Sequence, residues 1–231
     1  MGLINDSAKV ATSARIFDEV VIGSTVIIHD FVTIFPGVTI EDNVEIMEGA
    51  VIGRLPRGAR ATARKVREDF GKVVIGEGSV ISPNAVIYTD VVIGKGTLIG
   101  DGASIREACR IGDNCIISRC VTVNYNTKIG NRTKIMDNTH ITGNMVIGDD
   151  VFISVLVATT NDNNIGLQGY DEEKVVGPTI EDKVAVGAGA NILPGVIVGE
   201  AAIVGAGSVV TKNVPKRTLV VGIPAKVVRE L

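Results

Sequence analysis

Residues 75–146 read IGEGSV ISPNAV IYTDVV IGKGTL IGDGAS IREACR IGDNCI ISRCVT VNYNTK IGNRTK IMDNTH ITGNMV, with one aliphatic residue at the head of every block of six. A helix has a period of about 3.6 residues and a simple strand a period of about 2, and neither sustains a strict six. A six-residue repeat indicates a parallel β-helix, in which short strands stack coil upon coil. The same repeat occupies residues 4–52 and 180–210, so it covers most of the 231 residues.

The second half of each block supports this interpretation. The fifth residue is small or β-branched in almost every block, and Met145 is the one large exception in this stretch. A narrow prism has room for one bulky inward residue per strand, and the next inward residue must be small. Glycine often follows the aliphatic residue, where we expect a turn that favours positive φ; these glycines are Gly23, Gly76, Gly94, Gly112, Gly130 and Gly148.

These blocks, together with the closing segments Val214-Pro215 and Gly222-Ile223-Pro224-Ala225-Lys226, resemble the hexapeptide-repeat acyltransferase superfamily. The resemblance covers nearly the whole chain. It implies an all-β, single-stranded left-handed parallel β-helix in which three hexads make one triangular coil of 18 residues. It also implies a homotrimer that carries acyl-CoA sites between subunits. The left hand follows from the resemblance, because periodicity alone does not fix handedness.

The repeat predicts one elongated solenoid with two interruptions. At about 4.8 Å per coil, the hexads build about ten coils and a prism roughly 45 Å long. We expect the β-helix to span residues 1–214, with insertions at 53–74 and 159–179, and a short C-terminal extension at 215–231.

Composition limits the partners. The net charge is −3, aromatic residues make up 3% and tryptophan is absent, which argues against nucleic-acid binding. The sequence shows no signal-peptide pattern and no run long enough to span a bilayer, so we expect no membrane insertion and a cytoplasmic location. His29 and His140 are the only histidines, and we expect no metal site. Cys109 and Cys115 fall on the small inward position, where a thiol acts as a compact hydrophobe, and Cys120 points outward.

The first insertion is basic. It contains Arg54, Arg57, Arg60, Arg64, Lys65 and Arg67. Arginine forks match phosphate oxygens, so this loop, beginning with Arg54, is a candidate for gripping a diphosphate of the substrate. The alternative is a solvated loop without a ligand, which is the usual state of a charge run.

The second insertion is polar at its start, with Asn161, Asp162 and Asn163 able to hydrogen-bond hydroxyls and amines of a substrate. Turn preference alone is the alternative explanation for these residues. Since residues 18 apart stack, Ala158 lies one coil above His140, and we expect the loop to leave the prism at an outward corner that carries His140. A neutral imidazole there is a candidate general base. The alternative is that His140 orients the substrate or caps a turn. We interpret the other histidine, His29, as structural.

Two tiers of small residues, beginning Gly187-Ala188 and Gly205-Ala206, are 18 residues apart and therefore stack. They leave a groove in which backbone groups can meet the pantetheine arm of acetyl-CoA. Lys212 and Lys226 are candidates for the coenzyme A phosphates, with Lys216 and Arg217 as further choices. The alternative is that small residues merely suit tight corners.

Within the superfamily, residues 105–154 and the following TTNDN at 159–163 most resemble transferases that acetylate nucleotide-linked amino sugars for surface polysaccharides. That resemblance implies acetyl-CoA as co-substrate and His140 and Asn161–Asn163 as site residues. Ser154-Val155-Leu156 departs from the Pro-Gly corner that the resemblance leads us to expect before the loop. Alternatives are O-acetylation of a sugar or serine, acylation of an amino-acid precursor, and, from another class, a non-catalytic scaffold.

Overall fold

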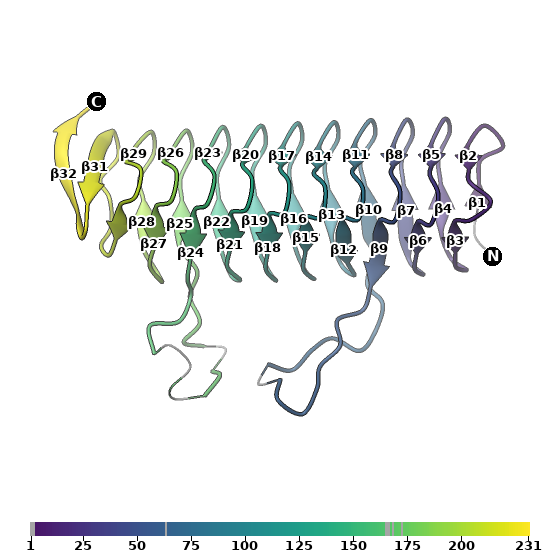
Figure 1. The fold of residues 1–231 in the computed structure, drawn as a ribbon, viewed down its shortest axis with the longest axis horizontal. Coiled ribbons are helices and arrows are strands. Elements are labelled where there is room, and N and C mark those ends of the chain that lie inside the picture. The colour runs from purple at the N-terminus through teal and green to yellow at the C-terminus, as the bar shows by residue number, and fades with distance from the viewer. Residues whose placement is uncertain (1–2, 63, 165–166, 168, 172) are drawn as a thin grey trace.

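The protein is a long β-solenoid, seen in a computed structural model that describes residues 3–62, 64–164, 167, 169–171 and 173–231. Three parallel sheets run along its length, with ten, twelve and ten strands, and every third strand pairs within one sheet. Figure 1 shows the coils stacked as a rod with the two termini at opposite ends. The predicted fold class, an all-β parallel β-helix of hexapeptide repeats, is confirmed.

The first sheet consists of β1 (Leu3–Ile4), β4 (Val21–Ile22), β7 (Val38–Ile40), β10 (Val73–Ile75), β13 (Val92–Ile93), β16 (Arg110–Ile111), β19 (Lys128–Ile129), β22 (Val146–Ile147), β25 (Thr179–Ile180) and β28 (Ile197–Val198). The second consists of β2 (Lys9–Val10), β5 (Ile27–Ile28), β8 (Glu45–Ile46), β11 (Val80–Ile81), β14 (Leu98–Ile99), β17 (Ile116–Ile117), β20 (Lys134–Ile135), β23 (Phe152–Ile153), β26 (Ala185–Val186), β29 (Ile203–Val204), β31 (Thr218–Gly222) and β32 (Ala225–Glu230). The third consists of β3 (Arg15–Ile16), β6 (Thr33–Ile34), β9 (Val51–Arg54), β12 (Val86–Tyr88), β15 (Ser104–Ile105), β18 (Thr122–Val123), β21 (His140–Ile141), β24 (Ala158–Thr159), β27 (Asn191–Ile192) and β30 (Val209–Val210).

The core follows directly from the hexad. The aliphatic residue at the head of each block points inward and stacks on its equivalent in the next coil, as Ile129 does on Ile147. Ile117, Ile135 and Ile153 are 0% exposed, and burial of such a side chain contributes about 1.5–3 kcal/mol. The small fifth residue, Thr133 for example, is also fully buried.

The coil count is slightly higher than predicted, because two hexads lack the expected signal. In β24 the inward position is taken by Thr159, which is 1% exposed and therefore belongs to the core rather than to the insertion. In β31 it is taken by Val220, which pairs with Val204 of β29 and extends the second sheet. Strand β32 then turns back antiparallel to β31.

The three edges of the prism are distinct. We call the turn between the first and second sheets the ladder edge, that between the second and third sheets the Gly-Ala edge, and that between the third and first sheets the loop edge. Both insertions leave the loop edge, one between β9 and β10 and the other between β24 and β25. Figure 1 shows the two loops on the same side of the rod. Residues 63, 165, 166, 168 and 172 of the predicted insertions lie outside the described residues.

The glycines after the aliphatic residues have another cause than the predicted positive φ. A Cβ on Gly130 would lie 2.3 Å from Asp149 Oδ1 and 2.5 Å from the carbonyl carbon of Gly148 in the next coil. Close approach of adjacent coils therefore excludes a side chain there. Positive φ instead falls two residues later in the turn, at residues such as Arg132 (56°) and Gly96 (61°).

Within the described part of the chain, no helix has the length and apolar character needed to cross a bilayer.

Candidate functional site

His140 is the first residue of β21 and lies on the outer side of the third sheet. It was predicted at a corner, but alternation along the strand turns Ile141 inward and His140 outward on the flat face. The His140 side chain is half-buried, and its Nδ1 lies 2.7 Å from Thr122 Oγ1 in the coil before. The backbone is fixed as well, because Thr159 Oγ1 donates to the carbonyl of His140 at 3.0 Å.

The electrostatics suit a proton acceptor. Burial lowers the pKa of His140 below its ordinary value, so the imidazole is neutral at neutral pH. When Nδ1 carries the hydrogen and donates to Thr122 Oγ1, the lone pair of Nε2 is available to a substrate. Among the described residues, no protein group hydrogen-bonds to Nε2.

The second insertion is fastened beside His140. Asn161 Nδ2 donates to the carbonyl of Gly143 at 3.1 Å, three residues beyond His140, and the N–H of Val176 donates to the carbonyl of Asn161 at 2.9 Å. Ala158 pairs directly with His140. The structure therefore brings the start of this loop within one coil of the imidazole, at the edge next to its sheet.

The other predicted residues of this loop lie farther out. Asp162 Oδ1 accepts from the N–H of Asn164 at 2.7 Å. Asp162 also lines a small cavity of about 50 Å³ within the loop, together with Lys174 and Asp171. Asn163 is exposed in the turn that follows. Asn161 thus hydrogen-bonds to the coil of His140.

A cluster that sequence reasoning missed joins the two insertions; we call Arg64, Glu107, Tyr125 and Tyr170 the loop clasp. Arg64 Nη1 lies 2.5 Å from Glu107 Oε1, and its guanidinium carbon lies 3.6 Å from the centroid of the Tyr125 ring. The hydroxyl groups of Tyr125 and Tyr170 are 3.2 Å apart. Arg64 belongs to the first loop and Tyr170 to the second, so the clasp connects them across the loop edge.

Glu107 is the buried charge of this clasp, with a side chain 4% exposed. Burial acts to raise the pKa of Glu107, but hydrogen bonds from Arg106 and Arg64 outweigh it and lower the pKa. A carboxylate held between two guanidinium groups stays ionised, and losing either partner would leave it poorly compensated.

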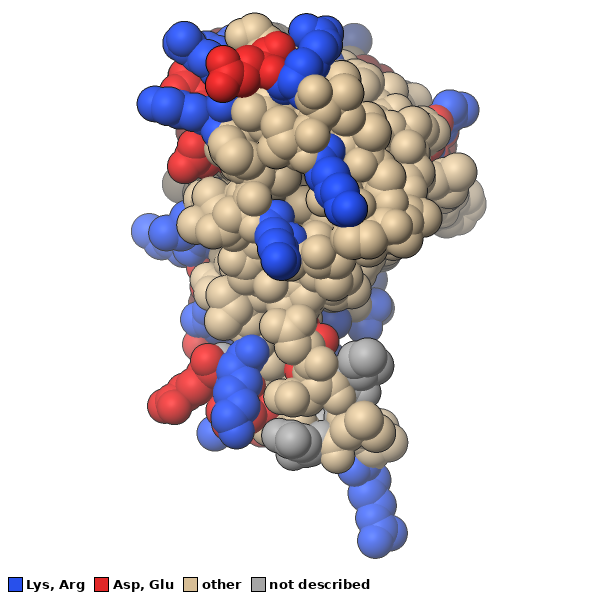
Figure 2. All heavy atoms as spheres, turned by 90° about the vertical axis from the view of Figure 1, so that its left-hand side faces the viewer, with Lys and Arg blue, Asp and Glu red and all other residues tan. Residues whose placement is uncertain are grey.

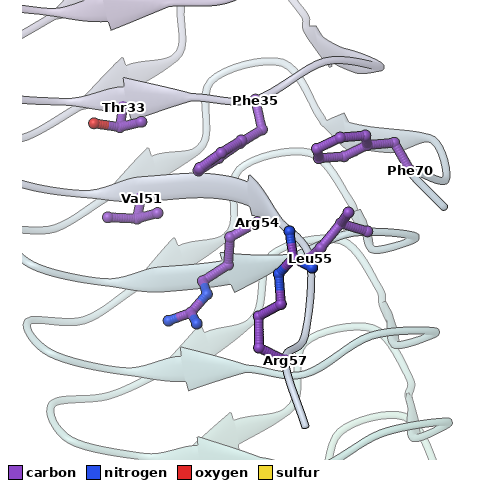
Figure 3. Close-up of a pocket in the computed structure, with 7 residues that line it drawn as sticks. All are labelled: Thr33, Phe35, Val51, Arg54, Leu55, Arg57 and Phe70. Carbon is purple, nitrogen blue, oxygen red and sulfur yellow. The ribbon is translucent and has the colours of Figure 1, made fainter. Parts of the chain in front are cut away.

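Arg54 lies away from His140. In the third sheet, β9 and β21 are four strand spacings apart, about 19 Å. Arg54 instead lines a cavity of about 470 Å³ under the first insertion, with Thr33, Phe35, Val51, Leu55, Arg57 and Phe70. Figure 3 shows these side chains around the end of β9. The structure does not bring Arg54 together with the histidine.

The two small tiers lie on the Gly-Ala edge, ahead of β27 and β30. A Cβ on Gly187 would lie 2.5 Å from the backbone nitrogen of Ala206, so the tiers are in direct contact. Gly189 and Gly207 face open space. Among the described residues, the N–H groups of Ala188 and Ala206 have no hydrogen-bond partner. His140 directly follows the same edge, two strand spacings from β27, about 10 Å.

The C-terminal basic residues do not gather at these tiers. Lys212 follows β30 at the loop edge. Lys216 and Arg217 lie between Val214, which bridges to the first sheet, and β31 of the second sheet, hence at the ladder edge. Lys226 is the second residue of β32 and pairs with Val221, whose side chain borders Gly205. Figure 2 shows basic side chains at separate places on this end of the rod. Lys226 is the one that the fold places next to a tier.

The few aromatic residues are a signal in the sequence that could have marked the loop edge, although the prediction of that edge did not use it. The chain has five phenylalanines and three tyrosines. Phe17, Phe35, Phe70, Tyr88, Tyr125 and Tyr170 all lie at the loop edge or in its insertions. Their position in the hexad, just after the aliphatic residue, marks three of them in the sequence. Phe70 and Tyr170 lie in the insertions, outside the hexad repeat, so no position in the repeat marks them.

The other histidine lies in an early coil. His29 Nε2 is 2.7 Å from Glu45 Oε1 on the neighbouring strand, a contact that fits the structural role expected for it. Over the residues that the structure describes, no group of three or more His, Cys, Asp or Glu side chains is arranged to hold a metal ion.

Comparisons with known proteins find similar repeats, partial sequence matches and a similar fold. The family described as "Bacterial transferase hexapeptide (six repeats)" matches residues 177–212, and "GMPPB C-terminal domain" matches residues 70–163. The chain is 44% identical over 87 residues to the serine acetyltransferase of Buchnera aphidicola from Acyrthosiphon pisum, covering 38% of this chain and 32% of that protein. It is 51% identical over 65 residues to the 2,3,4,5-tetrahydropyridine-2,6-dicarboxylate N-acetyltransferase of Staphylococcus aureus, covering 28% and 27%.

Among solved structures, the UDP-N-acetylglucosamine acyltransferase of Arabidopsis has a similar fold, with a TM-score of 0.64 at 20% identity over 99% of this chain and 74% of that one. The chain spans about a third or less of the length of the curated relatives it matches. The matched repeats and the shared fold confirm the predicted resemblance to hexapeptide-repeat transferases.

Proposed function

We propose that this chain, a hexapeptide-repeat β-solenoid of the bacterial transferase type, is an acetyl-CoA-dependent N-acetyltransferase that acts on the amino group of a nucleotide-linked amino sugar. The observation that carries the proposal is the position of His140. It is a half-buried imidazole of lowered pKa, between the Gly-Ala edge and the fastened start of a polar loop. The relatives that match over part of the chain are acetyltransferases by name, which supports acyl transfer.

The chemistry needs a thioester, an amine and a base. The amine nitrogen attacks the thioester carbonyl carbon, and Nε2 of His140 takes the amine proton. The carbon–sulfur bond then breaks, and the proton passes to the departing thiolate of coenzyme A. In this proposal, the N–H groups of Ala188 and Ala206, which lack a partner among the described residues, hydrogen-bond the amide carbonyls of a pantetheine arm along the Gly-Ala edge. Holding both substrates in line supplies much of the rate.

The assembly and the remaining site residues belong to the same proposal. Exposed apolar residues on the first and second sheets, such as Val146 and Phe152, favour packing against further copies. A homotrimer with sites between subunits, in the cytoplasm and in the service of surface polysaccharides, is the assembly we propose. In it Asn161, with Asp162 and Asn163 behind it, borders the sugar, and Lys226 meets a coenzyme A phosphate. Lys212 contacts a coenzyme A phosphate only if a neighbouring subunit supplies the rest of that coenzyme site.

A second candidate is O-acetylation of serine, which is favoured by the partial match to a serine acetyltransferase. The same base serves a hydroxyl nucleophile, which needs its proton removed more than a neutral amine does. O-acetylation of a sugar and acylation of an amino-acid precursor differ from these candidates in the acceptor alone.

The test is release of free coenzyme A thiol from acetyl-CoA with separate acceptors: nucleotide-linked amino sugars, the corresponding hydroxy sugars, serine and an amino-dicarboxylic acid. We expect release with an amino sugar nucleotide. Release with serine alone would replace the proposal by its runner-up. If none of these acceptors supports thiol release, the solenoid is a scaffold and the enzymatic proposal is refuted.

A further inference from the structure

The cavity under the first insertion lies apart from His140, the residue to which acetyl transfer is assigned above. It has a volume of about 470 Å³, within the usual range of small-molecule sites. Its lining comes from the coil of β6, from β9 and from the first insertion, and β9 lies four strand spacings from the strand of His140. One side of the lining is apolar and the other is cationic (Figure 3).

The apolar side is a preformed aromatic wall. Phe35 stacks on Phe17 of the coil before, with ring centroids 5.1 Å apart and planes 10° apart. The corresponding position in the next coil is Gly53, where a Cβ would lie 2.7 Å from Val38 Cγ2. Phe70, from the returning end of the insertion, stacks on Phe35 instead, at 6.0 Å. Phe70 is 41% exposed, so part of its ring is available to a ligand.

The cationic side consists of Arg54 and Arg57. Two other arginines of this insertion are neutralised: Arg64 pairs with Glu107, and Arg67 pairs with Asp90. Neither Arg54 nor Arg57 forms an ion pair with a carboxylate among the described residues. Arg54 is held in place through its guanidinium carbon, 4.9 Å from the centroid of the Tyr88 ring. Two guanidinium groups without a counter-ion beside an aromatic wall suit a ligand that joins a flat ring to a multiply charged anion.

We propose that this cavity binds a nucleoside diphosphate, with its base against Phe35 and Phe70 and its diphosphate between Arg54 and Arg57. Two sources share this chemistry: the nucleotide of a sugar nucleotide, and the adenosine diphosphate end of coenzyme A. A separation of about 19 Å from His140 makes binding here and acetyl transfer there separately measurable.

The test is calorimetric titration of the full chain with UDP, GDP, coenzyme A, uridine and pyrophosphate. We expect a nucleoside diphosphate to bind at least about tenfold more tightly than uridine or pyrophosphate, because both halves of the cavity contribute. The double variant Arg54→Gln/Arg57→Gln should lose about 100-fold in affinity, or about tenfold per charge-assisted contact. Arg60→Gln, an exposed arginine of the same loop outside the lining, is the matched control and should bind as the wild type does.

The variants decide the outcome. Phe70→Ala should lower the affinity for nucleoside diphosphates and leave the affinity for pyrophosphate unchanged. General unfolding would lower both affinities. If UDP or GDP binds more tightly than coenzyme A, and this binding depends on the two arginines, the ligand of the cavity is the sugar nucleotide. If coenzyme A binds more tightly, the ligand is coenzyme A. Pyrophosphate binding as tightly as the nucleotides, or an unchanged affinity in the double variant, overturns the proposal. His140→Asn should keep this binding while transfer is lost, so failure of the proposed reaction remains distinguishable.

Discussion

The ladder edge and the loop edge have the same hexad geometry but different side chains. On the ladder edge from Lys95 to Asp182, one side-chain oxygen in each coil accepts a backbone N–H of the coil before. Asp113 accepts from Lys95 at 2.8 Å, Asn131 from Asp113 at 2.9 Å and Asp149 from Asn131 at 2.8 Å. On the loop edge the equivalent positions hold Glu107 and Tyr125, which contact the insertions instead. The repeating scaffold is thus stabilised where turn side chains hydrogen-bond the backbone of the neighbouring coil. Where the turn side chains contact the insertions instead, the scaffold can carry a functional site.

The largest expected effect separates chemistry from the scaffold. His140→Asn should lower kcat about 100- to 10,000-fold, because the general base is lost, with a smaller change in KM. Steady-state kinetics with the acceptor found by thiol release measure it. The control is Lys134→Gln, at the same position of the preceding hexad on the second sheet. An unaltered kcat for His140→Asn would remove the base role and leave orientation of the substrate.

Glycine substitutions test the difference between the edges in stability. Gly130→Ala places a Cβ 2.3 Å from Asp149 Oδ1 and against backbone on the ladder edge, and should lower the free energy of unfolding by about 2–3 kcal/mol. Gly143→Ala on the loop edge meets the Tyr125 ring at 2.8 Å, a side chain able to shift, and should cost about 1 kcal/mol. Denaturant unfolding of both variants compares them. Equal losses would show that the loop edge is as rigid as the ladder.

The loop clasp is tested by removing its cation. Arg64→Met should raise the rate of chymotrypsin cleavage in both insertions about tenfold, the opening expected from a loss of ~1.4 kcal/mol. The reason is that Arg64 bonds Glu107 and covers the Tyr125 ring, which reaches Tyr170 of the other loop. Arg60→Met is the matched control. Faster cleavage confined to the first insertion would mean that the two loops are independent.

The pH dependence follows from the burial of His140. Because burial lowers its pKa, kcat/KM should stay high down to a midpoint below 6.5, the ordinary histidine value, and fall at lower pH as the base is protonated. The sign for stability is the same. Between the folded and unfolded pKa values the unfolded chain binds more protons, so stability decreases as pH falls through that window. A midpoint above 6.5 would contradict this assignment.

The smallest effect concerns the thiols. Cys120 is exposed and should react with a disulfide reagent in the native protein without changing its stability. Cys109 and Cys115 are buried, and burial raises the pKa of Cys109 to about 12, so both should react only after unfolding. The chromophore released by the reagent before and after denaturation gives the number of reactive thiols in each state. Three rapidly reacting thiols would show that the core opens between coils.

The sequence predicted most of the fold and part of the site. Residues with a place in the hexad were located correctly, such as Thr133 in the core and the contacting tiers at Gly187 and Gly205. The stacking of Ala158 on His140 was predicted as well. Thr159 was assigned to the insertion because it is polar, yet its hydroxyl is satisfied inside the core by the N–H of Thr142 and the carbonyl of His140.

The loop residues escaped prediction for a different reason. Arg64 has no phase in the repeat, and its position depends on a carboxylate 43 residues away. Arg54 and His140 belong to one predicted substrate site, yet four coils separate them. Composition identifies a basic loop and a polar loop, but contacts between non-periodic segments arise only from three-dimensional packing.

By itself the sequence determined the solenoid, its core and its register, because the coils between the insertions have the same length and nearly every hexad has one inward aliphatic side chain. The tertiary structure decided which chemistry-bearing groups meet. It placed both insertions on one edge, joined them through the loop clasp, and put the arginine-lined cavity apart from the imidazole. The physical reason is that backbone stacking repeats locally along the chain, whereas the contacts of the insertions depend on side chains far apart in sequence.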